Sequence, residues 1–102
     1  MAIVIHAARA TRHWVPAGVQ RGDRMYHLLS DRFGAEGRAE LVAFARRYGL
    51  RPQWLQYAGT YREHFDVRED TGLDMIADGA VLLTNRELGT LLAAKRASGG
   101  WP

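Results

Sequence analysis

The sequence contains no cysteine, three prolines and, as Lys95, a single lysine among its 102 residues. The absence of cysteine excludes disulfides, thiolate metal sites and thiol nucleophiles, so any metal must be bound by histidine or carboxylate. No apolar run approaches the roughly 20 residues that a membrane-spanning helix needs, and the N-terminus lacks the pattern of a secretion signal. We therefore expect a cytoplasmic protein that does not enter a membrane.

Several catalytic motifs are also missing. The sequence has no Gly-x-Gly-x-x-Gly, no Gly-x-x-x-x-Gly-Lys-Ser/Thr and no Gly-x-Ser-x-Gly. These absences disfavour dinucleotide-dependent oxidoreductases, P-loop enzymes and serine hydrolases. The single lysine falls in the last turn of the predicted C-terminal helix, which disfavours a Schiff-base enzyme.

The basic residues are almost all arginine and are unevenly distributed. Thirteen of the 14 are arginine, and the first 62 residues carry ten basic against four acidic side chains, whereas the remainder carries four against seven. The planar guanidinium suits phosphate and carboxylate. This asymmetry predicts either a basic patch for a phosphate-bearing ligand or two halves whose charges cancel when the chain folds.

The hydrophobic pattern predicts a single α/β domain. With 47% apolar and 25% charged residues the composition is globular, and the length suits one domain. We expect four short strands, at residues 2–6, 24–30, 53–57 and 80–83, in a mixed sheet, and the last of them is expected to be buried. A long basic loop covers residues 7–24. Three helices should pack on the sheet, one between Gly34 and Gly49, one near residues 68–77, and one that begins at the Thr84-x-x-Glu87 capping box. Residues 1–97 form the expected domain and residues 98–102 a frayed tail.

Polar residues lie at or just after the ends of the expected strands. His6 and Tyr57 close two strands, Asp31 follows another, and Thr84 and Asn85 follow the last. Ligands of such sheets commonly bind beyond the carboxyl ends of the strands. Several of these polar side chains are therefore expected to converge at one edge.

Three motifs carry a resemblance to a known family. They are the His-x-x-x-Asp of His27 and Asp31, the Trp-x-Gln of Trp54 and Gln56, and the His-aromatic-Asp of residues 64–66. With the Glu40-Leu41 and Gly79-Ala80-Val81 segments, they make residues 2–92 similar to the small bacterial and phage proteins catalogued as domain of unknown function 4031. The resemblance implies related folds but no activity.

The histidines and aspartates are the first candidates for chemistry. His64 and Asp66 stand at i and i+2, which on a strand places both side chains on one face. With His27 and Asp31 they supply two imidazoles and two carboxylates, enough for a divalent metal held by Asp31 and Asp66, or for acid-base catalysis by His64 and Asp66. In the structural alternative, Asp66 caps the following helix and His64 binds a backbone carbonyl.

A second group combines aromatic, amide and basic side chains. Trp54 and Tyr57 can stack a base that Gln56 reads, unless they pack in the core. A phosphate is expected to meet Arg9, Arg12, Arg24 and His27. The sequence thus predicts a small binding protein for a nucleotide or nucleic acid; the alternative is a metal-assisted phosphodiesterase or nuclease. A purely structural or adaptor protein is the third class, and a homo-oligomer is possible.

Overall fold

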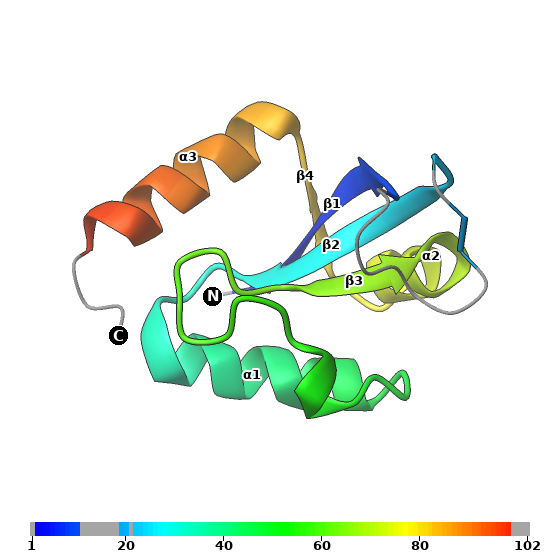
Figure 1. The fold of residues 1–102 in the computed structure, drawn as a ribbon, viewed down its shortest axis with the longest axis horizontal. Coiled ribbons are helices and arrows are strands. Elements are labelled where there is room, and N and C mark those ends of the chain that lie inside the picture. The colour runs from blue at the N-terminus through cyan, green and yellow to red at the C-terminus, as the bar shows by residue number, and fades with distance from the viewer. Residues whose placement is uncertain (1, 11–18, 21, 99–102) are drawn as a thin grey trace.

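The computed structural model describes residues 2–10, 19–20 and 22–98. Its sheet has the strand order β3-β2-β1-β4, in which β1 is antiparallel to β2, β2 is antiparallel to β3, and β1 is parallel to β4. The predicted class, one α/β domain with a mixed four-stranded sheet and three helices, is confirmed (Figure 1). In chain order the elements are β1 (Ile3–Arg9), β2 (Arg24–Ser30), α1 (Gly34–Arg46), the 3-10 helix η1 (Pro52–Trp54), β3 (Phe65–Arg68), α2 (Glu69–Ala77), β4 (Val81–Leu83) and α3 (Asn85–Ala97).

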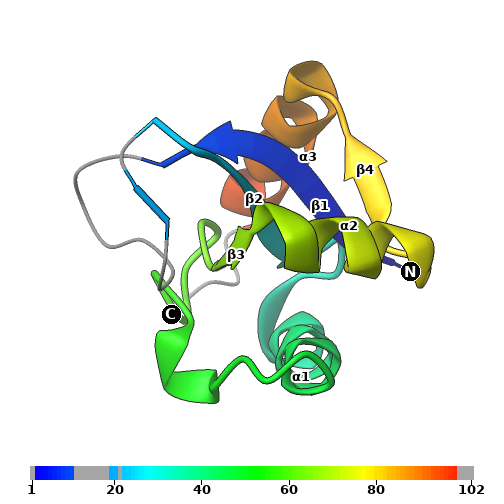
Figure 2. The same cartoon turned by 90° about the vertical axis from the view of Figure 1, so that its right-hand side faces the viewer.

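The two faces of the sheet have different roles. Ile5 pairs with Leu28 and Leu28 with Phe65, and these side chains form a buried core with residues of α1 and α2. Because side chains alternate along a strand, the next residues, His6 and His27, point to the opposite face. Both views place α3 on the other side of the sheet from α1 (Figures 1 and 2). The apolar core therefore lies under one face, and the histidines are carried by the other.

Residues 53–57 do not form the predicted strand. Pro52 instead starts a 3-10 helix. After this helix, Gln56 pairs with His64 in an isolated β-bridge. Proline fixes φ and lacks the N–H that a strand ladder needs, and Tyr57 has a φ of 53°, which ends any extended run. The strand that completes the sheet is β3, which pairs with β2.

The C-terminal strand also differs from its prediction. β4 lies at the edge of the sheet, and its Val81 and Leu82 are 47% and 52% exposed, so the expectation of a buried strand is wrong. The predicted capping box at the start of α3 is present: Thr84 Oγ1 accepts from Glu87 N, and Thr84 N donates to Glu87 Oε1. None of the described helices is long and apolar enough to cross a membrane.

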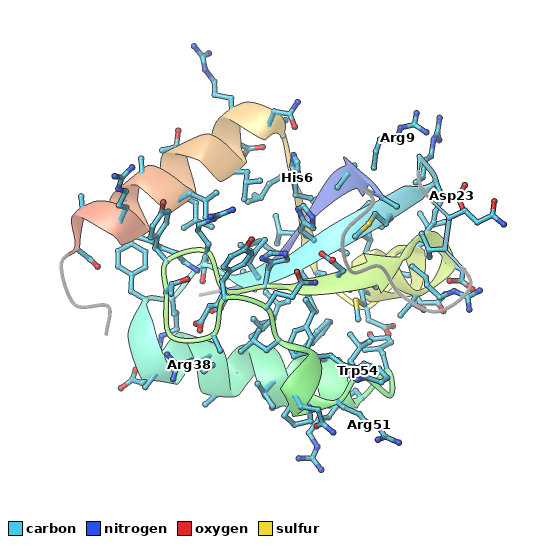
Figure 3. All side chains as sticks on the ribbon, viewed as in Figure 1. His6, Arg9, Asp23, Arg38, Arg51 and Trp54 are labelled. Carbon is cyan, nitrogen blue, oxygen red and sulfur yellow. The ribbon has the colours of Figure 1, made fainter. Side chains whose placement is uncertain are left out.

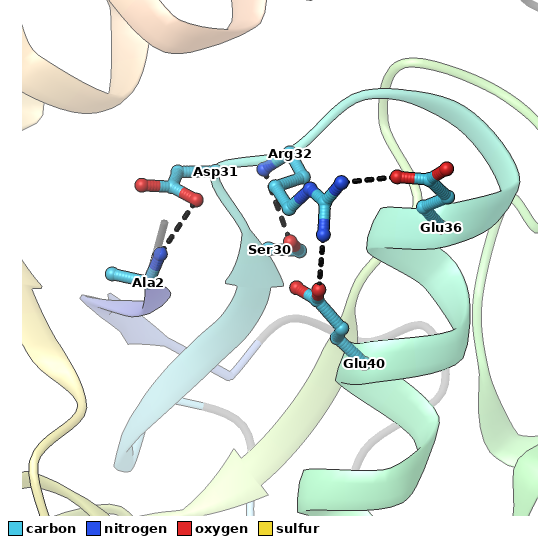
Figure 4. Close-up of polar contacts among 6 residues, drawn as sticks. All are labelled: Ala2, Ser30, Asp31, Arg32, Glu36 and Glu40. Carbon is cyan, nitrogen blue, oxygen red and sulfur yellow. Dashed lines mark hydrogen bonds and ion pairs between the residues drawn. The ribbon is translucent and has the colours of Figure 1, made fainter.

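The connection from β2 to α1 is fixed by side-chain contacts (Figure 4). Asp31 Oδ1 accepts a hydrogen bond from Ala2 N at 2.7 Å, and Arg32 N donates to Ser30 Oγ at 3.0 Å. The Arg32 guanidinium pairs with two glutamates of α1, Glu36 and Glu40. Asp31 thus ties the end of β2 to the start of the chain.

Candidate metal centre

A row of polar residues crosses the sheet on the face that carries His6. His6 of β1 is paired with His27 of β2, and His27 is paired with Asp66 of β3. Paired residues on neighbouring strands point to the same face, so the three side chains lie side by side. The register of the sheet therefore brings together residues that are up to 60 positions apart in the sequence.

The loop before β3 adds His64 to this row. Gln56 and His64 exchange two backbone hydrogen bonds, of 2.9 and 3.1 Å, which close the loop between them. The buried carboxylate of Glu63 holds the loop in place, because it accepts from Arg38 Nε at 2.8 Å and from Gly59 N at 3.0 Å. His64 is thus positioned by backbone pairing on one side and a buried ion pair on the other.

Three potential metal ligands converge at this place. Asp66 Oδ1 lies 3.2 Å from His64 Nε2 and 3.4 Å from His27 Nε2. One ligand atom from each residue can be chosen so that all lie within 4.8 Å of one another. The other carboxylate oxygen, Oδ2, accepts a 2.6 Å hydrogen bond from Gln56 Nε2, which orients Asp66. The i and i+2 spacing of His64 and Asp66 does place them together, as predicted.

The hydrogen bonds of His64 leave its inner nitrogen available. His64 Nδ1 lies 2.7 Å from the carbonyl oxygen of Arg62, and because a carbonyl only accepts, Nδ1 carries the proton and donates. In the neutral ring, Nε2 then holds a lone pair directed at Asp66. A backbone carbonyl on the far nitrogen is the usual arrangement of metal-binding histidines. The predicted contact of His64 with a carbonyl is therefore present, and it is compatible with metal binding.

Asp66 Oδ1 is buried and has no hydrogen-bond partner. It faces the Nε2 atoms of His27 and His64 but forms no hydrogen bond with either of them. A buried charged acceptor in that position is costly unless a cation neutralises it. The predicted alternative, that Asp66 caps the helix that follows, is wrong, because Asp66 lies inside the sheet and α2 has no side-chain cap.

The ionisation of the site suits a metal ion. Burial, the charge of His64 and that of His6 together lower the pKa of His27 to about 4, although Asp66 acts in the opposite direction. Burial raises the pKa of Asp66, but contact with His64, the hydrogen bond from Gln56 and the charges of His64 and His27 outweigh it and lower that pKa. At pH 7 the site therefore presents a neutral His27 and an ionised Asp66, the forms that bind metals.

Tyr57 and Arg62 lie beside the three ligands. The Tyr57 ring stacks on that of His64 with centroids 5.9 Å apart, and the Arg62 guanidinium lies 4.3 Å from the Tyr57 centroid. Arg62 is exposed and, within the described ranges, forms no ion pair with a carboxylate. The candidate centre therefore has the aromatic ring of Tyr57 and the positive charge of Arg62 at its side.

Arg9 and Arg24 do not join this site. Arg9 and Arg24 are paired with each other, two positions along the strands from the Ala7–Tyr26 pair. Because side chains alternate along a strand, both arginines point to the face of the sheet opposite to the histidines. Both line a cavity of about 310 Å³ with Glu69, and Arg24 also lines one of about 390 Å³ that contains Asp23, Glu69 and Asp70. Carboxylates thus offset the arginines in both cavities. Figure 3 shows His6 and Arg9 well apart along β1.

Two other residues predicted for the site, Asp31 and Trp54, also lie away from the three ligands. Asp31 directly follows β2, four residues after His27 and about 13 Å from it at roughly 3.3 Å per residue, and it is bound to Ala2. The prediction of a metal shared by Asp31 and Asp66 is thereby corrected. Trp54 lies on η1, 39% exposed, with the Arg51 guanidinium 5.9 Å from its ring. Arg12 lies outside the described residues.

Two residues that the sequence places among the converging polar side chains, His6 and Asn85, meet beside the three ligands. His6 Nε2 lies 2.5 Å from Asn85 Oδ1, so the middle of β1 and the start of α3 meet beside His27. Asn85 follows the last strand as predicted, whereas the prediction that His6 closes its strand is wrong, because β1 continues to Arg9. Neither residue stands in a recognisable motif. Arg62 stands in no motif, and the folded loop places its guanidinium against the Tyr57 ring.

This combination defines a small α/β protein with a candidate metal centre of two histidines and one aspartate. The chain belongs to the family described as "Protein of unknown function (DUF4031)", whose sequence profile matches residues 15–95, and the predicted resemblance is thereby confirmed. No curated protein and no solved structure matches the chain.

Proposed function

We propose that this protein binds a divalent transition metal through His27, His64 and Asp66 and uses it to hydrolyse a phosphoester. The observation that supports this proposal most directly is the buried Asp66 Oδ1, which faces two imidazole nitrogens and has no hydrogen-bond donor. A metal ion between the three ligand atoms neutralises the carboxylate and accepts both lone pairs.

The donor set favours catalysis over a structural metal. Two imidazoles and one carboxylate leave coordination positions open, as in hydrolytic zinc sites, whereas structural zinc is enclosed by four protein ligands. A bound divalent metal supplies a nucleophilic water at neutral pH and polarises a phosphoryl oxygen. The protein's own contribution is to orient His64 through the Arg62 carbonyl and Asp66 through Gln56.

Arg62 favours a phosphate-bearing substrate. Its guanidinium lies next to Tyr57, which in turn stacks on the ligand His64. A guanidinium that pairs with no carboxylate of the described residues attracts anions, and its geometry matches the oxygens of a phosphate group. This arrangement supports the phosphodiesterase alternative over the binding pocket predicted around Arg9, Arg24 and Trp54, since those residues do not meet the histidines.

The test compares two aspartate variants of the same kind. Asp66→Asn removes the charge of the proposed ligand, and Asp31→Asn makes the same change at the predicted ligand that the fold places elsewhere. Zn²⁺, Co²⁺ and Mn²⁺ are titrated calorimetrically into metal-free protein, and metal-dependent hydrolysis of bis(p-nitrophenyl) phosphate is measured.

We expect the wild type to bind one metal ion per chain. In Asp66→Asn the metal affinity should fall at least tenfold, about the scale found when residues around a metal site are altered. Asp31→Asn should retain wild-type metal affinity and hydrolysis. A wild-type protein that binds none of the three metals, or equal affinities in the two variants, contradicts the proposed centre. Metal binding with no hydrolysis of the phosphodiester contradicts the proposed reaction but not the centre.

A further inference from the structure

His6 carries the second buried side-chain atom that lacks a hydrogen-bond partner. In the part of the chain that the structure describes, the buried side-chain nitrogen and oxygen atoms without one are His6 Nδ1 and Asp66 Oδ1. Leaving a buried polar atom without a partner is costly, so each of these atoms calls for an explanation. Both lie in the same polar row, one on either side of His27.

Asn85 fixes which nitrogen of His6 is available. His6 Nε2 lies 2.5 Å from Asn85 Oδ1, and because that oxygen only accepts, Nε2 carries the proton. Nδ1 of the neutral ring is therefore an acceptor. Asn85 is the first residue of α3, directly after the N-cap Thr84, so the helix terminus holds the imidazole in one orientation.

His6 lies close to the candidate centre but outside its ligand group. The His6 and His27 rings are 6.3 Å apart between centroids, with planes inclined by 25°. The group of atoms that lie within 4.8 Å of one another contains His27, His64 and Asp66, and does not contain His6. His6 is therefore the next ring of the polar row beyond the ligands, from which a contact with the metal site runs through a water.

We infer that His6 Nδ1 accepts a hydrogen bond from the water bound to the metal and thereby orients the nucleophile of the hydrolysis. This inference rests on the proposed metal centre and adds a residue to it. His6 aligns the water, Asn85 aligns His6, and neither binds the metal. A fixed acceptor of this kind holds the water in one orientation. In that orientation a lone pair of the water oxygen points at the phosphorus of the substrate.

Two substitutions at His6 separate the roles of its nitrogens. The amide of glutamine reaches approximately the position of Nε2, so His6→Gln keeps the contact with Asn85 and removes the acceptor at Nδ1. The amide of asparagine ends near Nδ1, so His6→Asn keeps an acceptor there and loses the contact with Asn85. The measurements are calorimetric Zn²⁺ affinity, kcat and KM for bis(p-nitrophenyl) phosphate, and a crystal structure of the Zn²⁺-loaded wild type.

We expect His6→Gln to bind Zn²⁺ with wild-type affinity and unchanged KM while kcat falls about 100-fold, the scale of a misplaced reacting group. His6→Asn should recover part of kcat. In the crystal, a zinc-bound water should lie within hydrogen-bond distance of Nδ1. The inference is overturned by an unchanged kcat in His6→Gln, by a loss of Zn²⁺ affinity in both His6 variants, or by bound zinc with no water at Nδ1. Absence of zinc from the wild-type crystal overturns the proposed function itself.

Discussion

His27 and Asp66 occupy directly opposite positions on β2 and β3, and the Nε2 of the histidine lies 3.4 Å from Oδ1 of the aspartate. The pair is set by strand register, so it does not depend on the loops that surround it. Each residue is also one position away from a core residue on its own strand, Leu28 and Phe65, whose side chains point the other way. The same pairing therefore fixes both the core and the polar row.

The first prediction concerns acid stability. The pKa of His27 is lowered to about 4, so between about pH 6.5 and 4 the unfolded chain binds a proton at this residue and the folded protein does not. Stability therefore falls as the pH drops through this window. The lowered pKa of Asp66 adds a loss in the same direction at still lower pH. Urea unfolding at pH 7 and pH 4.5 measures the effect.

For the metal-free wild type we expect a loss of about 2 kcal/mol, less than the full shift implies because 34% of the His27 side-chain surface is exposed. His27→Gln has no imidazole to protonate, so most of this dependence should disappear in that variant. An equally steep loss of stability in His27→Gln between the two pH values would show that another group causes it.

The second prediction concerns Gln56, the residue that orients the carboxylate. Its Nε2 donates to Asp66 Oδ2 at 2.6 Å, and Gln56→Leu removes that donor from a buried anion. We expect a loss of about 1–3 kcal/mol in the free energy of unfolding and a Zn²⁺ affinity that is about 10- to 100-fold lower. Gln53→Leu, on the exposed helix η1, is the matched control and should change neither quantity. Equal effects of the two variants would rule out this role for Gln56.

Periodicity and capping signals were sufficient to predict most of the fold. The helix around Leu41, the capping box at Thr84 and the strand at residues 24–30 occur as the pattern indicates. The strand predicted at residues 53–57 fails because Pro52 and the positive φ of Tyr57 override its aromatic composition. β-propensity describes how well a side chain fits a half-buried surface, and it says little about local backbone geometry.

The candidate site was only partly predictable, for a reason of topology. The His64-x-Asp66 spacing places two ligands on one strand face from sequence alone. His27 and His6 join them through register, which depends on pairings between distant strands. Arg9 and Arg24 were expected at the same site, but alternation along β1 and β2 turns them to the opposite face.

The third prediction concerns the packing of α2 against β2. A Cβ added at Gly72 would lie 2.2 Å from Cδ2 of Tyr26, the neighbour of His27, whereas one added at Gly89 in α3 meets no atom within 4 Å. Gly72→Ala should therefore cost about 1–3 kcal/mol through overpacking, and Gly89→Ala should gain about 0.5–1 kcal/mol through helix propensity. The thermal unfolding midpoints of the two variants test this prediction. A stabilised Gly72→Ala protein would contradict the close contact of α2 with Tyr26.

The last prediction concerns the backbone of Tyr57, whose φ of 53° is, among the described residues, the one positive value outside glycine. An aromatic residue in the left-handed region is strained by roughly 1–2 kcal/mol, and strain of this kind is concentrated at functional sites. Tyr57→Gly and Tyr57→Ala both remove the ring, but only glycine adopts this φ without strain. We therefore expect the glycine variant to be about 1 kcal/mol more stable than the alanine variant in urea unfolding.

Tyr61 provides the control for this comparison, because its φ is not positive and its ring lies in the same loop. There the order should reverse, with Tyr61→Ala more stable than Tyr61→Gly, since glycine loses more conformational entropy on folding. If the ring of Tyr57 also contributes to substrate binding beside His64, KM for the aryl phosphodiester should rise equally in the two Tyr57 variants despite their different stabilities. Equal stability of Tyr57→Gly and Tyr57→Ala would mean that the loop does not hold Tyr57 in the left-handed conformation.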